Sequence, residues 1–469
     1  MKKQLLLICA YLFVATGAHA SDDRLPNIVL LIGDDHGAPY FGFMGNETVV
    51  TPNMDMIANA GLTFTVGHAT ANHCRPSLRT LMTGLHPVQY KQRENAIIEQ
   101  RRADDANYAS MSRTEQTMWE NVERAAVMQT FDTLPTLLRE QGYVSWQGGK
   151  WWENSYRNGG FDEGMTEGWD MSLFGTDDFF HEMMGAEGNE LGRTTMQPVF
   201  DFISRNQEKP FFIWYGPMLP HTPLDSGYRH RKYYDEQPHL SESAKMYYGN
   251  ITWWDEGVGQ LLDHVATEGL LDNTLFVYIN DNGWEQEPTV EYKVPGATYQ
   301  NNLNFSNGGG KGKLGLYDQS FRTPVIFYWR GRIQGAMNTE SLVSMEDIVP
   351  TILDVAGASL PDGLPGYSLK PLLDGDEMEE RDAIVGYAHQ RRSAEDMMGE
   401  RAEGYYVRTR RWHFMWYKDR DEMALYDMTV DPKSENNVLD ANKHLIEGFI
   451  QRIEAWKKKI GLTEPIAVS

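Results

Sequence analysis

The chain has 469 residues, 41% of them hydrophobic, and its 43 basic and 66 acidic side chains give a formal net charge of -23. This length and apolar content suffice for one large domain or two unequal ones. So acidic a chain argues against nucleic acid as a partner, because phosphate backbones are bound mainly by lysine and arginine. An anionic ligand would therefore need a local basic pocket.

Residues 1–20 have the three parts of a secretory signal peptide. Two lysines precede the apolar run LLLICAYLFVATGA, which ends at the small-residue motif AHA. The run is shorter than the roughly 20 residues that span a bilayer, so we expect cleavage after Ala20, export to the periplasm or the medium, and no membrane span afterwards. Cleavage would remove Cys9 and leave Cys74 as the only cysteine, which excludes an intramolecular disulfide.

Apolar runs alternate with helical patterns along residues 21–375. Each run has the length and continuity of a strand that is buried on both faces. Strands that alternate with helices predict an α/β fold. The runs are 27–33, 211–219, 274–280 and 323–329, and the helical patterns are 53–61, 133–142, 194–206 and 345–357.

The pattern changes after residue 375. Residues 405–419 and 423–428 are aromatic and alternating, as in an antiparallel hairpin, and a helical pattern follows at 445–460. We therefore predict a main domain over 21–375 and a smaller α+β subdomain over 376–469, built on a short antiparallel sheet.

Two further segments fit neither a strand nor a helix pattern. Residues 86–132 are polar and charged, and residues 285–312 are rich in asparagine and glycine. Long irregular insertions between core elements often form binding loops, and we predict that role for both segments.

Polar side chains follow two of the predicted strands. Asp34 and Asp35 end the first apolar run, and Asp281 and Asn282 end a later one. Ligands of an open α/β sheet bind at the carboxyl ends of its strands, and oxygen ligands of this kind suit Ca²⁺ or Mg²⁺. One such pair would usually be a turn or a helix cap. Two pairs, with Cys74 between them in the sequence, favour a metal site.

Six sequence motifs resemble, in order and approximate spacing, those of the type I, formylglycine-dependent sulfatases of the alkaline phosphatase superfamily. The likeness runs from about residue 26 to ALYDMTVDPKSENNV, near residue 438. The resemblance implies an alkaline phosphatase-like mixed central sheet flanked by helices, and a catalytic sulfatase domain over 21–375. The motifs are PNIVLLIGDDHG, CRPSLRTLMTG, GGKWW, PHTP, NDNG and KLGLYDQSFRTP.

The resemblance also implies a modified nucleophile and a metal cofactor. Cys74 would be oxidised to formylglycine by a formylglycine-generating maturation enzyme, and the aldehyde hydrate would attack the sulfur of a sulfate ester. The family's calcium ligands match Asp34, Asp35, Asp281 and Asn282, with residue 74 completing the shell. Calcium is expected rather than magnesium.

Three basic residues complete the catalytic set that the resemblance implies. Lys150 in GGKWW, His221 in PHTP and Lys313 in KLGLYDQSFRTP align with positions that bind the sulfate and protonate the leaving oxygen. Lys313 is assigned to this position rather than Lys311, because the number of residues between it and the RTP sequence that ends the motif matches the family pattern.

The sequence departs from the family pattern at two positions near the nucleophile. The arginine expected four residues after the cysteine is Leu78, with Arg79 next, and the histidine expected two residues after the GGK lysine is Trp152. One helical step rotates a side chain by about 100°, so Arg79 is not automatically equivalent. We place Arg79 and His73 among the candidate substrate-binding residues.

The expected substrate is a sulfated polysaccharide or oligosaccharide. Trp152 and Trp284 adjoin proposed site residues and could stack on sugar rings, although aromatic side chains also commonly pack a core. Two alternatives stay open: a phosphate or phosphonate ester hydrolase with a related metal site, and a non-catalytic, calcium-dependent glycan-binding protein. The second is motivated by Leu78 and Trp152.

Overall fold

The computed structural model describes residues 24–176, 178–291, 309–390 and 402–467. The predicted signal peptide, residues 1–20, lies outside these ranges, as does most of segment 285–312. Among the described residues, no helix combines the length and the apolar composition that crossing a membrane requires.

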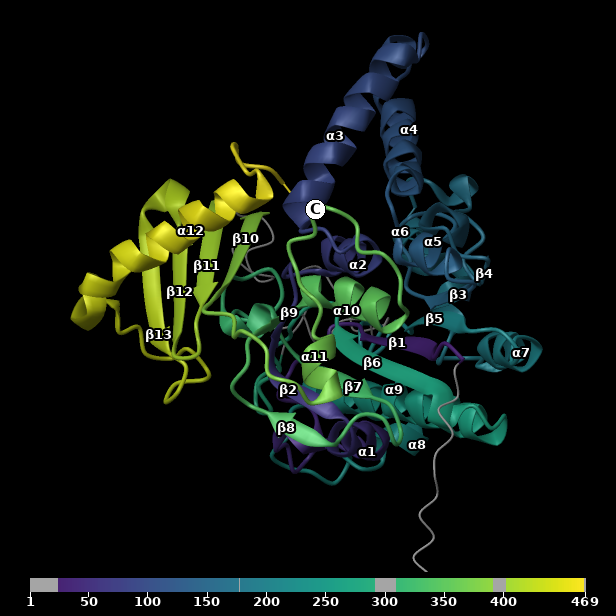
Figure 1. Cartoon of the computed structure of the whole chain (residues 1–469). Coiled ribbons are helices and arrows are strands. Elements are labelled where there is room, and N and C mark those ends of the chain that lie inside the picture. Colours follow the sequence, from purple (N-terminus) through teal and green to yellow (C-terminus); the bar gives the residue numbers. More distant parts are fainter. Residues whose placement is uncertain (1–23, 177, 292–308, 391–401, 468–469) are drawn as a thin grey trace, which may run out of the picture.

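In the described part of the chain, a nine-stranded mixed sheet forms the centre of the fold (Figure 1). Its strands are β1 (Asn27–Gly33), β2 (Leu62–His68), β3 (Val144–Gly149), β4 (Glu163–Gly164), β5 (Phe211–Gly216), β6 (Thr274–Asn280), β7 (Arg322–Tyr328), β8 (Ala336–Asn338) and β9 (Val343–Ser344). The order is β4-β3-β5-β1-β6-β7-β2-β8, with β9 beside β2. Strands β3, β5, β1 and β6 are parallel, whereas β7 is antiparallel to β6 and β2. The predicted mixed α/β sheet is confirmed.

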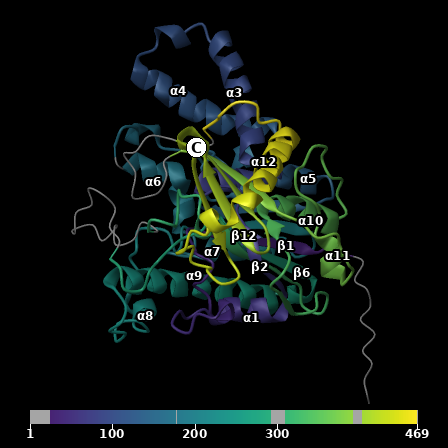
Figure 2. The ribbon, with the colours of Figure 1, turned by 90° about the vertical axis from the view of Figure 1, so that its left-hand side faces the viewer.

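Helices flank this sheet on both faces (Figure 2). The α-helices of the described residues, including α3, α4 and α12, which lie elsewhere as described below, are α1 (Pro52–Ala60), α2 (Cys74–Thr83), α3 (Pro87–Asp104), α4 (Arg113–Ala126), α5 (Leu134–Arg139), α6 (Asp178–Gly185), α7 (Gln197–Arg205), α8 (Tyr228–Arg231), α9 (Glu242–Thr267), α10 (Ile348–Val355), α11 (Lys370–Asp374) and α12 (Ile446–Ile460). Ile28 and Leu30 of β1 pack into the core on the side of α2, α5 and α10, and Val29 and Leu31 into the core on the side of α1, α7 and α9. Successive strand residues point to opposite faces, so burial on both sides requires the continuous apolar run seen in the sequence.

The segment 86–132 differs from the irregular loop that we expected. Helices α3 and α4 run side by side and project from the body of the molecule (Figures 1 and 2). Salt bridges join them, including Arg101–Glu123 at 2.6 Å, and the Ser112 side chain caps α4. Polar and charged residues surround most of α3, so this helix lacks the clear hydrophobic stripe from which helices are usually predicted.

A separate antiparallel sheet lies near the C-terminus, as predicted. Its strands, in order, are β10 (Ile384–Gln390), β11 (Ala402–Arg408), β12 (Trp412–Tyr417) and β13 (Glu422–Asp427). Helix α12 covers one face, where Phe414 stacks on Phe449. The other face packs on the main sheet's loops, where the His413 Nε2–H donates to Leu316 O at 2.7 Å and Arg408 Nε donates to Asp318 at 2.8 Å. The domain boundary at residues 375/376 stays a prediction.

Candidate active site

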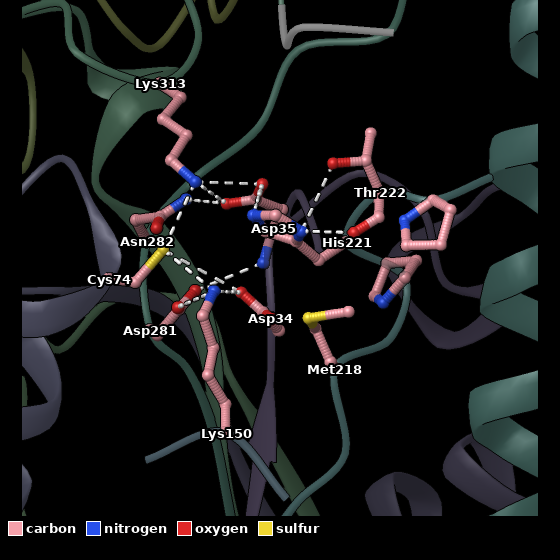
Figure 3. Close-up of polar contacts among 12 residues, drawn as sticks. Asp34, Asp35, Cys74, Lys150, Met218, His221, Thr222, Asp281, Asn282 and Lys313 are labelled. Atoms are coloured by element: carbon pink, nitrogen blue, oxygen red, sulfur yellow. Dashed lines mark hydrogen bonds and ion pairs between the residues drawn. The ribbon is translucent and has the colours of Figure 1, made fainter. Parts of the chain in front are cut away.

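The carboxylates predicted at two strand ends lie together. Strands β1 and β6 pair in parallel with Gly33 opposite Asn280, so the residues that follow them are neighbours at one edge of the sheet. The backbone N–H of Asp35 donates to Asp281 Oδ1 at 3.1 Å, and Asn282 Nδ2 donates to Asp35 Oδ1 at 2.8 Å. These residues and the basic side chains around them are shown in Figure 3.

Cys74 is the first residue of α2 and faces this cluster. It is 5% exposed, and its Sγ lies 3.0 Å from Lys150 Nζ, 3.2 Å from Lys313 Nζ and 3.8 Å from Asp34 Oδ1. Burial raises the pKa of the Cys74 thiol, the nearby Asp281 charge raises it further, and the two lysines do not offset this. An unmodified thiol here is therefore protonated at neutral pH.

The two lysines reach the cluster from different sides. Lys150 follows β3 and contacts Asp34 Oδ1 at 2.5 Å, while Lys313 contacts both carboxylate oxygens of Asp35, at 2.8 and 3.0 Å. Burial alone would lower the pKa of each lysine, but the surrounding carboxylates raise both above the ordinary value. Both side chains stay cationic.

The buried oxygen atoms at the strand ends fit a divalent cation. Asp34 Oδ2, Asp281 Oδ2 and Asn282 Oδ1 are buried and have no hydrogen-bond partner within the described chain. Burial and the charges of Asp34 and Asp35 raise the pKa of Asp281 well above its usual range, and the opposing charges of the two lysines do not offset this. A divalent cation would favour the ionised form of all three carboxylates, and together with the two lysines it would give the site a net positive charge, which suits an anionic substrate.

Asp35 and His221 face each other across the same site. Burial favours the neutral carboxyl, but the charges of Lys313, His221 and Lys150 prevail and lower the pKa of Asp35 to about 2. His221 Nε2 lies 3.6 Å from Asp35 Oδ2, and its Nδ1 lies 2.7 Å from Thr222 O. A carbonyl oxygen only accepts, so the ring carries a proton on Nδ1 and turns Nε2 toward the cluster.

Arg79 does not point into the site, which corrects its sequence-based assignment as a substrate-binding residue. Its guanidinium is buried and donates to both carboxylate oxygens of Glu153, at 2.8 and 3.1 Å, and to Glu94 at 3.0 Å. Leu78, four residues after Cys74, packs into the core. The next helical step carries Arg79 away from the nucleophile.

His73 and the two tryptophans lie around the site rather than among its charged groups. His73 precedes α2, and its Nδ1 lies 3.2 Å from Asn72 Oδ1. The Trp152 ring lies 6.0 Å from Lys150 Nζ, and Trp284 is 4% exposed and stacks on Tyr247. Their substrate-binding roles stay predictions.

The structure adds two residues that the sequence did not single out. Glu153 joins the loop after β3 to α2 through Arg75 and Arg79. Phe180 on α6 packs beside Trp152, with ring centroids 5.7 Å apart, and is 56% exposed. Arg75, which directly follows Cys74, could have suggested a carboxylate partner such as Glu153. No sequence signal marks Phe180.

The fold places carboxylate and amide oxygens and two lysines at one edge of the sheet, an arrangement suited to the hydrolysis of an anionic ester. The family model "Sulfatase" matches residues 26–358, and the model "N-sulphoglucosamine sulphohydrolase, C-terminal" matches residues 312–459. The chain therefore belongs to the formylglycine-dependent sulfatase family and is a sulfuric ester hydrolase.

Relatives extend over most of the chain. An arylsulfatase of Clostridium perfringens is 25% identical over 92% of this chain and 93% of its own length. The N-acetylgalactosamine-6-sulfatase of Canis lupus familiaris is 28% identical over 76% of this chain and 67% of its own length. Among solved structures, Ps i-CgsB has a TM-score of 0.68 at 21% identity, covering 93% of each chain. BT4656 in complex with D-glucosamine-2-N,6-O-disulfate has a TM-score of 0.64 at 19% identity, covering 94% of this chain and 99% of the other. These two structures share the fold.

Proposed function

We propose that this chain is an exported sulfatase that hydrolyses sulfate esters of carbohydrates, with residue 74 carried as formylglycine and a calcium ion held by the strand-end oxygens. The surroundings of Cys74 carry the proposal: the buried Lys150 and the partly buried Lys313 lie 3.0 and 3.2 Å from its Sγ, at the start of a helix. Cationic groups and a helix N-terminus favour an anionic group at this position.

Calcium is favoured over magnesium by the kind of donor. Asp34, Asp35, Asp281 and Asn282 supply protein oxygens, and Ca²⁺ is commonly enclosed by such ligands, whereas Mg²⁺ usually keeps several waters. A cation bound there would neutralise the carboxylates and polarise a sulfate ester.

The remaining steps fall to the chain's own side chains. An aldehyde hydrate at residue 74 would have two hydroxyl groups. One would attack the sulfur and displace the alcohol, and the second would re-form the aldehyde and release sulfate. Lys150 and Lys313 bind the anionic oxygens of the sulfate group, because both stay charged in a buried site. With its Nδ1–H bonded to Thr222 O, His221 turns Nε2 toward the cluster, and this atom can donate to the leaving oxygen when the ring carries a second proton.

A carbohydrate substrate is supported by the names of similar proteins and by one surface feature. The relatives include an N-acetylgalactosamine-6-sulfatase, and the similar structures include Ps i-CgsB in complex with k-i-k-neocarrahexaose. Phe180 and Trp152 place aromatic rings beside Lys150, where a sugar ring attached to the bound sulfate would lie. Export rests on the signal-peptide pattern of residues 1–20.

The proposal is tested by mass spectrometry and kinetics on protein from its native host. The tryptic peptide that contains residue 74 should have the mass of formylglycine, and Cys74→Ala should lose turnover while retaining the wild-type melting temperature. Sulfated oligosaccharides should be hydrolysed, and an aryl sulfate should be preferred over the matching aryl phosphate. Unmodified Cys74 with sugar binding but no turnover, or a clear preference for phosphate, would contradict it.

A further inference from the structure

His221 lies on a loop, residues 217–224, whose backbone supplies few hydrogen-bond donors. Pro217, Pro220 and Pro223 have no N–H, so the loop cannot satisfy its own carbonyl oxygens by regular pairing. Within the loop, the Leu219 N–H donates to Pro217 O at 2.7 Å. The His221 ring donates to Thr222 O, and the other carbonyls of the loop that accept hydrogen bonds do so from other parts of the chain.

Arg193 supplies many of these donors. Its Nε and one terminal nitrogen donate to Met218 O at 3.1 and 2.8 Å, and the same terminal nitrogen donates to His221 O and to Pro223 O, each at 3.1 Å. The other terminal nitrogen pairs with Asp225. One planar guanidinium thus contacts carbonyls on both sides of His221, an arrangement that a lysine ammonium cannot reproduce.

The arginine is itself held in place by a tight turn between the short helix Ala186–Glu190 and α7. The N–H groups of Arg193 and Thr194 both donate to Glu190 O, at 3.1 and 2.9 Å, and Gly192 has φ +74°. The Arg193 side chain is only 9% exposed. Asn250 on α9 supports the same loop by donating to Pro223 O at 3.0 Å.

We propose that Arg193 is a positioning residue that fixes where the His221 imidazole meets the leaving oxygen. The inference rests on the role of His221 in the proposed function. The His221 ring is oriented through its Nδ1–H bond to Thr222 O, so its direction follows the backbone that Arg193 holds. Small displacements of a catalytic group cost large factors in rate, because its alignment with the reacting atom is lost.

The test compares two substrates that differ in their need for a proton donor. A sulfated sugar has a poor alkoxide leaving group, whereas para-nitrophenyl sulfate expels a stable anion without help. We expect Arg193→Lys to lower kcat/KM about tenfold or more for the sulfated sugar, but only about twofold for the nitrophenyl ester. His221→Ala should show a larger selective loss for the sugar, of ~100-fold or more. Asp225→Asn is the matched control: it removes the negative charge of the outer partner of Arg193, leaves the bonds to the loop carbonyls, and should be nearly neutral for both substrates.

A double-mutant cycle separates positioning from a general loss of structure. In the His221→Ala background, Arg193→Lys should add no further selectivity between the two esters. The inference is overturned if Arg193→Lys lowers kcat/KM equally for both esters. It is also overturned if Arg193→Lys keeps its full selective effect in the His221→Ala background. If Arg193→Lys does not fold, Arg193→Gln is judged by the same two comparisons.

The failure of the proposed function has a different signature. If His221→Ala lowers both rates equally, the proton-donor role of His221 is wrong, and the inference about Arg193 falls with it. If His221→Ala is selective and Arg193→Lys is not, only the inference about Arg193 fails.

Discussion

Replacing Glu153 with glutamine should destabilise the protein by about 3–5 kcal/mol, as is typical of breaking a buried ion pair. The carboxylate accepts four bonds, from Arg75 at 2.9 and 2.8 Å and from Arg79 at 2.8 and 3.1 Å. The amide is similar in shape but has one acceptor oxygen and no charge. It would therefore leave about half of these bonds unmade.

The magnitude follows from how well each arginine can find other partners. The Arg79 side chain is 4% exposed and keeps only Glu94, at 3.0 Å, whereas the Arg75 side chain is 21% exposed and can be hydrated. Hydrogen bonds to charged groups contribute roughly 1.5–3 kcal/mol each, so the unreplaced loss of two of them gives roughly 3–6 kcal/mol, and hydration of the partly exposed Arg75 places the loss in the lower part of that range.

Equilibrium urea unfolding at pH 7 measures this loss. The matched control is Glu163→Gln, which removes a salt bridge to Arg205 between side chains that are 46% and 56% exposed, and should cost no more than about 1 kcal/mol. Burial alone would raise the pKa of Glu153, but Arg75 and Arg79 lower it below 4.5. The difference in free energy of unfolding between the wild type and Glu153→Gln should therefore have its maximum value above pH 4.5 and decrease as the pH falls. A loss below about 1 kcal/mol at pH 7 would refute this account of the buried pairs.

Three further outcomes are expected. Chelation with EDTA should lower the melting temperature and abolish turnover, because the strand-end carboxylates would repel one another, and Ca²⁺ should restore both; an unchanged melting temperature would contradict the metal site. Lys313→Met should reduce kcat by about a hundredfold or more, since it removes a charge aimed at the sulfate oxygens; a loss below about threefold, measured with the folded protein, would show that Lys313 is dispensable. Burial raises the pKa of Asp255, which accepts the N–H of Met54 at 2.8 Å, from 3.8 to about 7, so the folded state binds this proton more tightly. The stability of the wild type relative to Asp255→Asn should therefore fall as the pH rises from 4 to 7, and urea unfolding that shows a constant difference over this range would contradict the prediction.

The strand-end part of the site could be predicted because its signals are local. A buried parallel strand needs a continuous apolar run, and the polar residues that end it must lie at the sheet edge, so the sequence alone suffices to bring Asp34 and Asp281 together. Cys74, Lys150 and His221 are short-range motif residues that became a site only through the family resemblance. Their contacts agree with that grouping.

The parts that escaped prediction depend on contacts between distant segments. Arg79 was assigned to the site by its closeness to Cys74 in the sequence, but the helix turns it toward Glu153, a partner that the sequence alone did not reveal. Arg193 acts on backbone carbonyls, which every residue carries, so no residue pattern marks its targets. Helix α3 escaped because its sequence lacks an apolar stripe and its contacts with α4 include salt bridges between distant residues.

The small C-terminal sheet bears on the order in which the protein becomes competent. Lys313 belongs to a loop that ends at Asp318, and that loop is held by His413 and Arg408, which come about ninety residues later in the chain. A chain that ends before β11 would contain every proposed metal ligand, Cys74 and both lysines. It would lack His413 and Arg408, whose hydrogen bonds hold the loop that carries Lys313. The C-terminal sheet thus contributes to the position of Lys313, and a product truncated before β11 should be less active than the whole chain.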